Sequence, residues 1–119
     1  MKKILPLLLF VLLAFAGCQR EPVTYQETND PREVAVNAEK FAKLTAKRSA
    51  HYAAEDWEAA IRQFTTMSKD YYCCRQDMTQ EELSRFDAAR LSFMQSVVKN
   101  GGDDLASKVK AVYAEVMGE

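Results

Sequence analysis

Residues 78–102, MTQEELSRFDAARLSFMQSVVKNGG, contain the start and the end of one α-helix in a single stretch. Thr79 and Glu82 have the T-x-x-E spacing of a capping box, in which each side chain accepts a hydrogen bond from the other residue's backbone N–H. Met78 and Leu83 occupy the two positions of the hydrophobic staple around that box. The glycine pair that closes the stretch suits a helix C-terminus, because glycine readily takes the left-handed conformation.

Between these signals, apolar side chains recur at steps of three and four residues, which is the spacing of one helix face. The face comprises Leu83, Phe86, Arg90, Phe93 and Val97, with Leu91, Met94 and Val98 widening it. A helix with such a face buries it against other elements of the fold. The stretch therefore predicts a core helix that begins at Thr79 and ends at Asn100.

The stretch before it has the same periodicity. Its core-facing residues are Trp57, Ile61, Phe64, Ser68 and Tyr71. Glu55 and Asp56 are typical of a first helical turn, although Ala53 and Ala54 stand where a capping Ser or Thr would be expected. We therefore predict that a break within residues 52–56 separates this helix from the preceding one.

An earlier helix is predicted to begin at Asp30. Asp30 suits the N-cap, Pro31 suits the first helical position, and Glu33 has the position of a capping-box acid. Its core face comprises Val34, Ala38, Phe41, Thr45 and Tyr52, with Leu44 beside them. On another side of this helix, Lys40, Lys43 and Lys47 lie together, with Glu39 spaced to pair with Lys43. We interpret this side as a solvated face; the alternative is a basic stripe for lipid headgroups or an acidic partner.

A last helix follows the glycine pair, capped by Asp103 or Asp104 and ended by Gly118. Its apolar face comprises Leu105, Val109, Val112 and Val116. No strand-like alternation of useful length is present. The sequence thus predicts an all-α fold over residues 30–119, a small up-and-down bundle of three to four helices joined by short connections.

Cys73 and Cys74 are the candidates for chemistry in this domain. A disulfide between them is unfavourable, since neighbouring Cα atoms lie about 3.8 Å apart and disulfides usually need 4.4–6.8 Å. Cys74 follows Met67 by one heptad, so we interpret it as a small core hydrophobe, with Cys73 at the helix end. Two alternatives stay open: a disulfide homodimer through Cys73, and a redox or metal function of both thiols. The pair lacks the spacer of a C-x-x-C motif and two further zinc ligands.

Other polar residues suggest no catalytic set. His51 is the single histidine and lies near a predicted helix end. The acidic pairs coincide with predicted helix starts, where carboxylates favour the helix dipole. Tyr71 and Tyr72 could present an aromatic surface to a sugar or peptide, although one of them is expected in the core. The sequence therefore predicts a non-enzymatic protein with no cofactor and no metal site.

The first 18 residues, MKKILPLLLFVLLAFAGC, have the layout of a secretory signal peptide: two lysines, an apolar run and small residues. The run is shorter than the 17–25 apolar residues of a membrane-spanning helix. The ending Phe15-Ala16-Gly17-Cys18 resembles a bacterial lipobox. This resemblance implies that residues 1–17 are removed and that Cys18 carries a diacylglyceryl group and an N-acyl chain. The alternative is ordinary cleavage after Ala14-Phe15-Ala16, which would leave Cys18 a free thiol.

Residues 18–29 are polar and aperiodic, and we interpret them as a flexible, lipid-anchored tether; the alternative is that Val23 and Tyr25 dock on the domain. In enteric-type bacteria, an Asp directly after the lipidated cysteine favours retention of the protein in the inner membrane. This chain has Gln19 at that position. By that analogy we expect the periplasmic face of the outer membrane. The chain holds 16 Lys and Arg against 17 Asp and Glu. Because nucleic-acid binding needs a basic surface, this balance argues against a nucleic-acid partner.

The strings Ala54-Glu55-Asp56-Trp57-Glu58 and Met78-Thr79-Gln80-Glu81-Glu82 open two of the predicted helices. In these strings the chain resembles small helical lipoproteins of unknown function from Bacteroides-type bacteria. The resemblance implies a helical fold and a cell-envelope address, and it assigns no catalytic residue. With the lipobox, it predicts a membrane-anchored interaction or structural module with an unidentified envelope protein as its partner.

Overall fold

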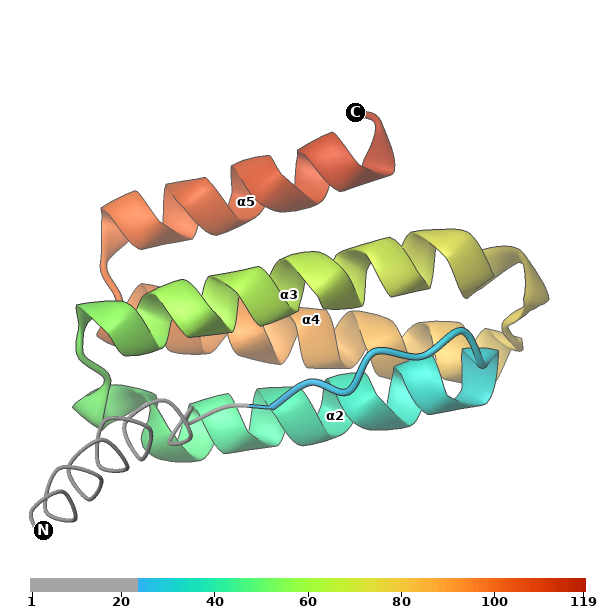
Figure 1. Ribbon diagram of the computed structural model, residues 1–119, viewed down its shortest axis with the longest axis horizontal. Helices are drawn as coiled ribbons and strands as arrows, with labels where there is room; N and C mark the ends of the chain where they lie inside the picture. Colours follow the sequence, from blue (N-terminus) through green and yellow to red (C-terminus); the bar gives the residue numbers. More distant parts are fainter. Residues whose placement is uncertain (1–23) are drawn as a thin grey trace, which may run out of the picture.

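The computed structural model describes residues 24–119, which form four α-helices (Figure 1). The helices are α2 (Pro31–Arg48), α3 (Ala54–Cys74), α4 (Gln80–Asn100) and α5 (Asp103–Met117). Short 3-10 turns, η1 (Ser49–His51) and η2 (Arg75–Asp77), follow α2 and α3. Each helix runs opposite to the one before it (Figure 1). The predicted all-α bundle is confirmed for this part of the chain, with four helices.

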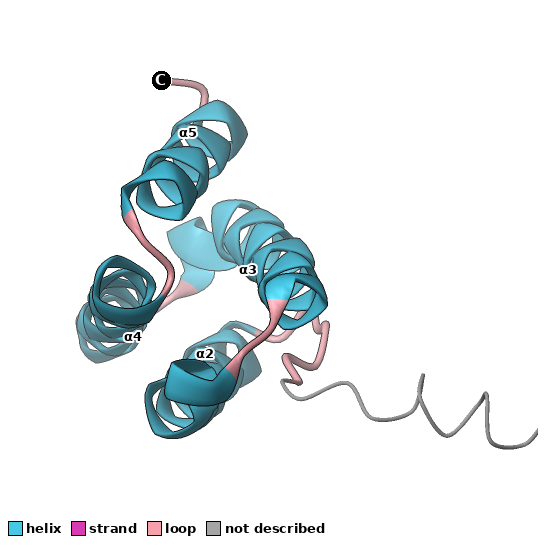
Figure 2. Cartoon of the chain, turned by 90° about the vertical axis from the view of Figure 1, so that its left-hand side faces the viewer, coloured by secondary structure: helices cyan, strands magenta, loops and turns pink. Residues whose placement is uncertain are grey.

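The four helices lie at the corners of a square (Figure 2). α2 packs beside α3 and α4, and α5 packs beside the same two helices from the other side. Consecutive helices α3 and α4 are therefore diagonal to each other, and α2 and α4 are parallel neighbours. Local sequence signals cannot predict this arrangement, because they specify each helix and not its neighbours.

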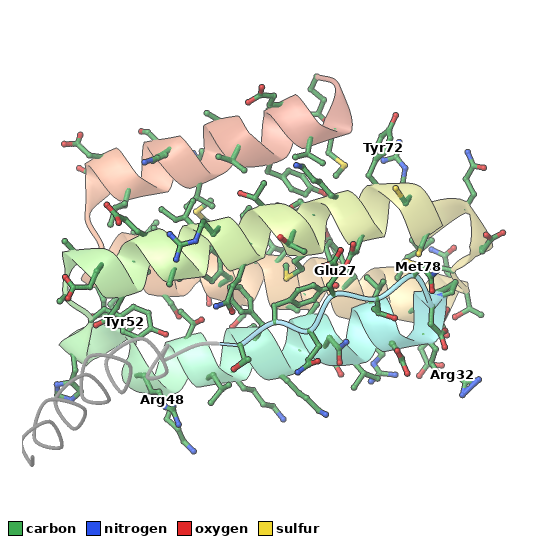
Figure 3. The ribbon with its side chains drawn as sticks, viewed as in Figure 1. Glu27, Arg32, Arg48, Tyr52, Tyr72 and Met78 are labelled. Carbon is green, nitrogen blue, oxygen red and sulfur yellow. The ribbon has the colours of Figure 1, made fainter. Side chains whose placement is uncertain are left out.

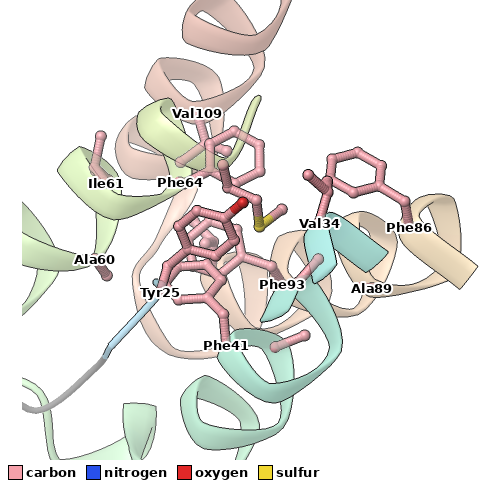
Figure 4. Packing of buried hydrophobic residues seen from close by; sticks show 14 of the residues in the cluster. Tyr25, Val34, Phe41, Ala60, Ile61, Phe64, Phe86, Ala89, Phe93 and Val109 are labelled. Carbon is pink, nitrogen blue, oxygen red and sulfur yellow. The ribbon is translucent and has the colours of Figure 1, made fainter. Parts of the chain in front are cut away.

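Aromatic side chains fill the centre of the square (Figure 4). The ring of Phe93 on α4 lies 4.8 Å from that of Phe64 on α3 and 5.0 Å from that of Phe41 on α2. A second diagonal pair joins Tyr71 to Phe86, with ring centroids 4.0 Å apart. These residues belong to the predicted helix faces, so the periodicity identified the centre of the core. The prediction that Leu91 and Val98 widen this face is wrong: they are 48% and 53% exposed, because each lies one residue, or 100°, beyond the buried side of α4.

The predicted helix starts are observed at α2 and α4. The Asp30 carboxylate accepts a hydrogen bond from the Arg32 N–H at 3.0 Å. Thr79 and Glu82 exchange both bonds of the capping box, at 3.0 and 3.1 Å. At α3, where no Ser or Thr is available, Asp56 accepts a bond from the Ala53 N–H at 2.8 Å. Asp56 thus makes one of the two bonds of a capping box, and its own N–H donates to the Ala53 carbonyl at 3.0 Å, where a capping hydroxyl would otherwise accept.

The predicted cap of the last helix is wrong. Gly102 precedes α5 with φ 96°, while Asp103 and Asp104 lie within its first turn. The N–H groups of Gly101 and Gly102 both donate to the Val97 carbonyl, at 2.7 and 3.1 Å. The chain therefore has one residue left in which to turn into α5, and that turn needs a positive φ, which glycine adopts without strain.

Candidate functional site

Residues 24–29 lie against the bundle between α2 and α3 (Figure 2), and we call this segment the strap. Tyr25 is its centre: 8% of its surface is exposed, and its ring meets Phe41 edge-on at 6.3 Å (Figure 4). The sequence predicts a flexible tether over residues 18–29. The described end of that segment is instead docked, because Tyr25 buries its ring in the core.

A polar row on α3 receives the strap. Gln63 and Asp70 are two helical turns apart, so they face the same side. The Tyr25 N–H donates to Gln63 Oε1 at 2.7 Å, and its phenol donates to Asp70 Oδ2 at 3.0 Å. The Thr28 N–H donates to the same Asp70 oxygen at 3.1 Å. One carboxylate therefore holds the strap at two points.

α2 fastens the other edge of the strap. The Asn37 side-chain amide donates to the Gln26 carbonyl at 2.9 Å, and the Thr28 hydroxyl donates to Glu33 at 2.8 Å. Glu33 thus binds the strap, in place of the capping role that its position suggested. The partners on α3 are 38 to 45 residues away from the strap in sequence, so the local pattern gave no sign of them beyond the aromatic side chain of Tyr25.

The environment of Tyr25 holds its phenol neutral. Burial raises the pKa of Tyr25 far above its ordinary value, and the neighbouring Asp70 carboxylate raises it further. The unfolded chain loses this phenol proton near the ordinary pKa of about 10. In the docked strap, the Tyr25 phenol keeps its proton to higher pH. Loss of this proton therefore favours release of the strap.

We expect the strap to detach in alkaline solution. A pKa raised by folding stabilises the folded state fully below the unfolded pKa, and this stability is lost as pH rises above about 10. Ultraviolet difference spectra should show tyrosinates that form only above the ordinary pKa, because burial raises the pKa of Tyr25, Tyr52 and Tyr113. Tyr25→Phe should remove one tyrosine from this late transition. Ionisation of all tyrosines in one step near the ordinary pKa would contradict the docking of Tyr25.

The two adjacent cysteines have different environments. Both are free thiols; Cys73 is exposed, whereas 5% of Cys74 is exposed. The Cys74 thiol donates to the Asn29 carbonyl at the end of the strap, at 3.4 Å. Burial raises the pKa of Cys74, and nearby Asp70 adds to the shift. The thiolate is the reactive species, and a raised pKa keeps Cys74 in the thiol form. Cys74 therefore packs in the core and is poorly suited to fast redox chemistry.

We expect thiol reagents to separate these cysteines. In the native protein, maleimide should modify Cys73 rapidly and Cys74 only as the strap opens, with rates that differ roughly tenfold or more. Cys73→Ser and Cys74→Ser assign the two phases by mass spectrometry. Equal fast rates, or a Cys74 that reacts fastest, would support the redox function.

The remaining candidate residues do not lie together at one site. Within residues 24–119, no group of three or more His, Cys, Asp or Glu side chains is arranged to hold a metal ion. His51 is exposed in η1. Tyr71 stacks on Phe86 in the core, whereas Tyr72 is 46% exposed with the Arg75 guanidinium 4.8 Å from its ring. The two tyrosines therefore do not form one aromatic surface.

Glu39 pairs with a residue that sequence spacing could not identify. Arg85 of α4 donates two hydrogen bonds to its carboxylate, at 2.9 and 2.6 Å. This bond lowers the pKa of Glu39 below its usual range. The Glu39–Arg85 pair borders a shallow groove between α2 and α4, lined by small residues such as Ala42, Ala88 and Ser92. Glu39 was expected to pair with Lys43, one turn along α2; its hydrogen bonds go to Arg85.

Comparison of the chain with protein-family models, curated proteins and solved structures returned no match. The resemblance to small helical lipoproteins therefore stays a prediction from the sequence. Cys18, the predicted lipidation site, lies outside the described residues. Of the predicted site residues, the structure places Cys73 and Cys74, and it adds the strap and its partners on α2 and α3.

Proposed function

We propose that this protein is a lipid-anchored component of the cell envelope. The observation that carries the proposal is the segment Met1–Cys18, with its basic start, its apolar run and a cysteine after small residues. On this proposal, residues 1–17 are removed and Cys18 carries the acyl chains. Two or more chains hold a protein stably on a membrane, whereas one chain binds reversibly.

The four-helix body then acts outside the cytosol as a non-enzymatic interaction or structural module. Three carboxylates with structural partners support this role: Asp70 fastens the strap, Asp56 bonds the start of α3, and Glu39 pairs with Arg85. None of the helices in residues 24–119 is both long and apolar enough to cross a membrane. The proposed location is the periplasmic face of the outer membrane, supported by Gln19 after the cysteine, and the proposed partner is another envelope protein.

Replacing Cys18 by serine tests the anchor. The full chain expressed in a bacterial host with radiolabelled palmitate should carry the label and sediment with membranes. Cys18→Ser should lose the label completely, because a hydroxyl cannot form the thioether. Cys73→Ser is the matched control and should keep both properties. An unlabelled wild-type chain whose mature N-terminus is Gly17 would refute the proposal.

A thiol function of Cys73 and Cys74 is the second candidate. The exposure of Cys73 at the end of α3 favours one form of it, a disulfide between two copies of the chain. The burial and raised pKa of Cys74 argue against joint redox or metal chemistry of the pair. Non-reducing gel electrophoresis of envelope fractions distinguishes these forms, since a dimer band that Cys73→Ser removes would establish the crosslink.

A further inference from the structure

Three lysines form the outward side of α2. Lys40, Lys43 and Lys47 are exposed, and at 100° per residue they lie opposite the buried residues of the same helix. We call this surface the lysine face. Figure 3 shows nitrogen-tipped side chains extending from this outer edge of α2, with Arg48 at its end. Residues 40–54 contain no acidic residue.

The two carboxylates of α2 that are nearest to the lysine face in sequence form hydrogen bonds with other residues. Glu33 binds the Thr28 hydroxyl, and Glu39 binds the Arg85 guanidinium through two hydrogen bonds. In the part of the chain that the structure describes, no carboxylate lies within salt-bridge distance of the three lysines. The three lysines therefore form a positive surface without a salt bridge in residues 24–119, and the Glu39 carboxylate that attracts Lys43 is shared with Arg85.

The strap brings this side of the bundle close to the lipid anchor. Tyr25 is fixed against α3, and it lies seven residues after Cys18, so at most about 25 Å separates the two. A tether that ran free to Asp30 would span about 40 Å. The strap also lies beside α2 and α3, away from α5 (Figure 2). The anchored bundle thus presents its α2 and α3 sides to the membrane.

Charge distinguishes these two sides. The exposed residues along α3 carry both signs, including Glu55, Glu58 and Lys69. The lysine face carries a single sign, and its charges lie on flexible stems that reach outward from the helix. Each basic side chain near an anionic lipid surface gains roughly a fivefold preference for that surface. Attraction of this kind acts within about 8 Å at physiological ionic strength, so a short tether is what makes it effective.

We propose that the lysine face docks on the headgroups of anionic phospholipids, so that the anchored bundle lies with α2 against the membrane. This inference rests on the proposed lipid anchor, which sets the distance between bundle and bilayer. Docking fixes the orientation of the body: α5, which lies diagonal to α2, faces away from the membrane, where a partner protein can reach it. The anchor supplies attachment, and the lysine face supplies orientation.

Lysine acylation measured by mass spectrometry tests the docking. The full chain, purified from membranes, is reconstituted in vesicles of phosphatidylcholine alone or of phosphatidylcholine with phosphatidylglycerol. On the anionic vesicles, acylation of the lysine face should slow roughly fivefold, while Lys108 and Lys110 on α5 should react equally in both vesicles. Salt at about 1 M shortens the screening length to about 3 Å and should abolish the protection.

Matched variants complete the test. In Lys40→Gln/Lys43→Gln, protection of Lys47 should fall towards the value in phosphatidylcholine, whereas Lys108→Gln/Lys110→Gln should leave it unchanged. Equal acylation rates in both vesicles, or equal protection of Lys108, would overturn the proposal. Protection in native envelopes without protection on anionic vesicles would also overturn it, in favour of an acidic protein partner. Intact mass reports the lipid on Cys18 separately, so failure of the anchor and failure of docking are distinguishable.

Discussion

Replacing Phe93 by alanine is expected to lower the free energy of unfolding by about 3–5 kcal/mol, the usual cost of removing a large aromatic side chain from a core. Phe93 is fully buried, and its ring contacts both Phe41 and Phe64. It therefore joins three helices, two of which are diagonal to each other. Removing it leaves a cavity that cannot close unless all three helices move.

Urea unfolding followed by circular dichroism measures this loss. Leu91→Ala on the same helix is the matched control: Leu91 is 48% exposed, so its truncation should change the stability by about 0.5 kcal/mol or less. Phe93→Leu keeps most of the apolar volume and should recover much of the loss. Similar effects of Phe93→Ala and Leu91→Ala would mean that the four helices do not pack around this ring.

Replacing Asp70 by alanine is expected to release the strap from the bundle. Its carboxylate accepts hydrogen bonds from the Tyr25 phenol and the Thr28 N–H. Hydrogen bonds to a charged group contribute about 1.5–3 kcal/mol each, and their loss leaves a buried phenol without its acceptor. For these partly buried bonds together, we expect a loss of about 2–4 kcal/mol, enough to raise the open population of the strap at least tenfold.

Amide hydrogen exchange reads this opening directly. In Asp70→Ala, the Tyr25 and Thr28 amides should exchange at least ten times faster, while amides in the middle of α4 keep their protection. Lys69→Ala, at the exposed neighbouring position, should leave the strap amides unchanged. Unaltered protection of Tyr25 in Asp70→Ala would show that ring burial alone holds the strap. Release would also lengthen the tether and weaken the lipid docking proposed for the lysine face.

The helices and most of their ends could be predicted because their signals are local. The capping box of Thr79 and Glu82, the cap at Asp30 and the apolar steps through Phe93 involve residues within one or two turns of each other. The prediction of the helix cap was wrong at the junction between α4 and α5. Gly102, and not Asp103, precedes α5, because closure of α4 leaves a single residue for the turn.

Docking of Tyr25 was an open alternative, but the partners of the strap on α3 could not be predicted, because they are distant in sequence. Apart from Tyr25, residues 24–29 are polar and aperiodic, which is typical of a linker. Gln63 and Asp70 are 38 and 45 residues away from Tyr25, and nothing in the local pattern links them. The Glu39–Arg85 pair is of the same kind, since 46 residues separate its members.

The sequence by itself determined that residues 30–119 are helical and which side of each helix faces the core, apart from the exposed Leu91 and Val98. It also predicts export and lipidation from the first 18 residues. These properties follow from hydrophobic periodicity, capping chemistry and a linear motif, all of which act over a few neighbouring residues. Only the tertiary structure decided which helices are neighbours, that Tyr25 fastens the strap, and that the carboxylates near the lysine face are occupied. Those outcomes depend on burial and on partners brought together by packing, and packing is a property of the whole chain.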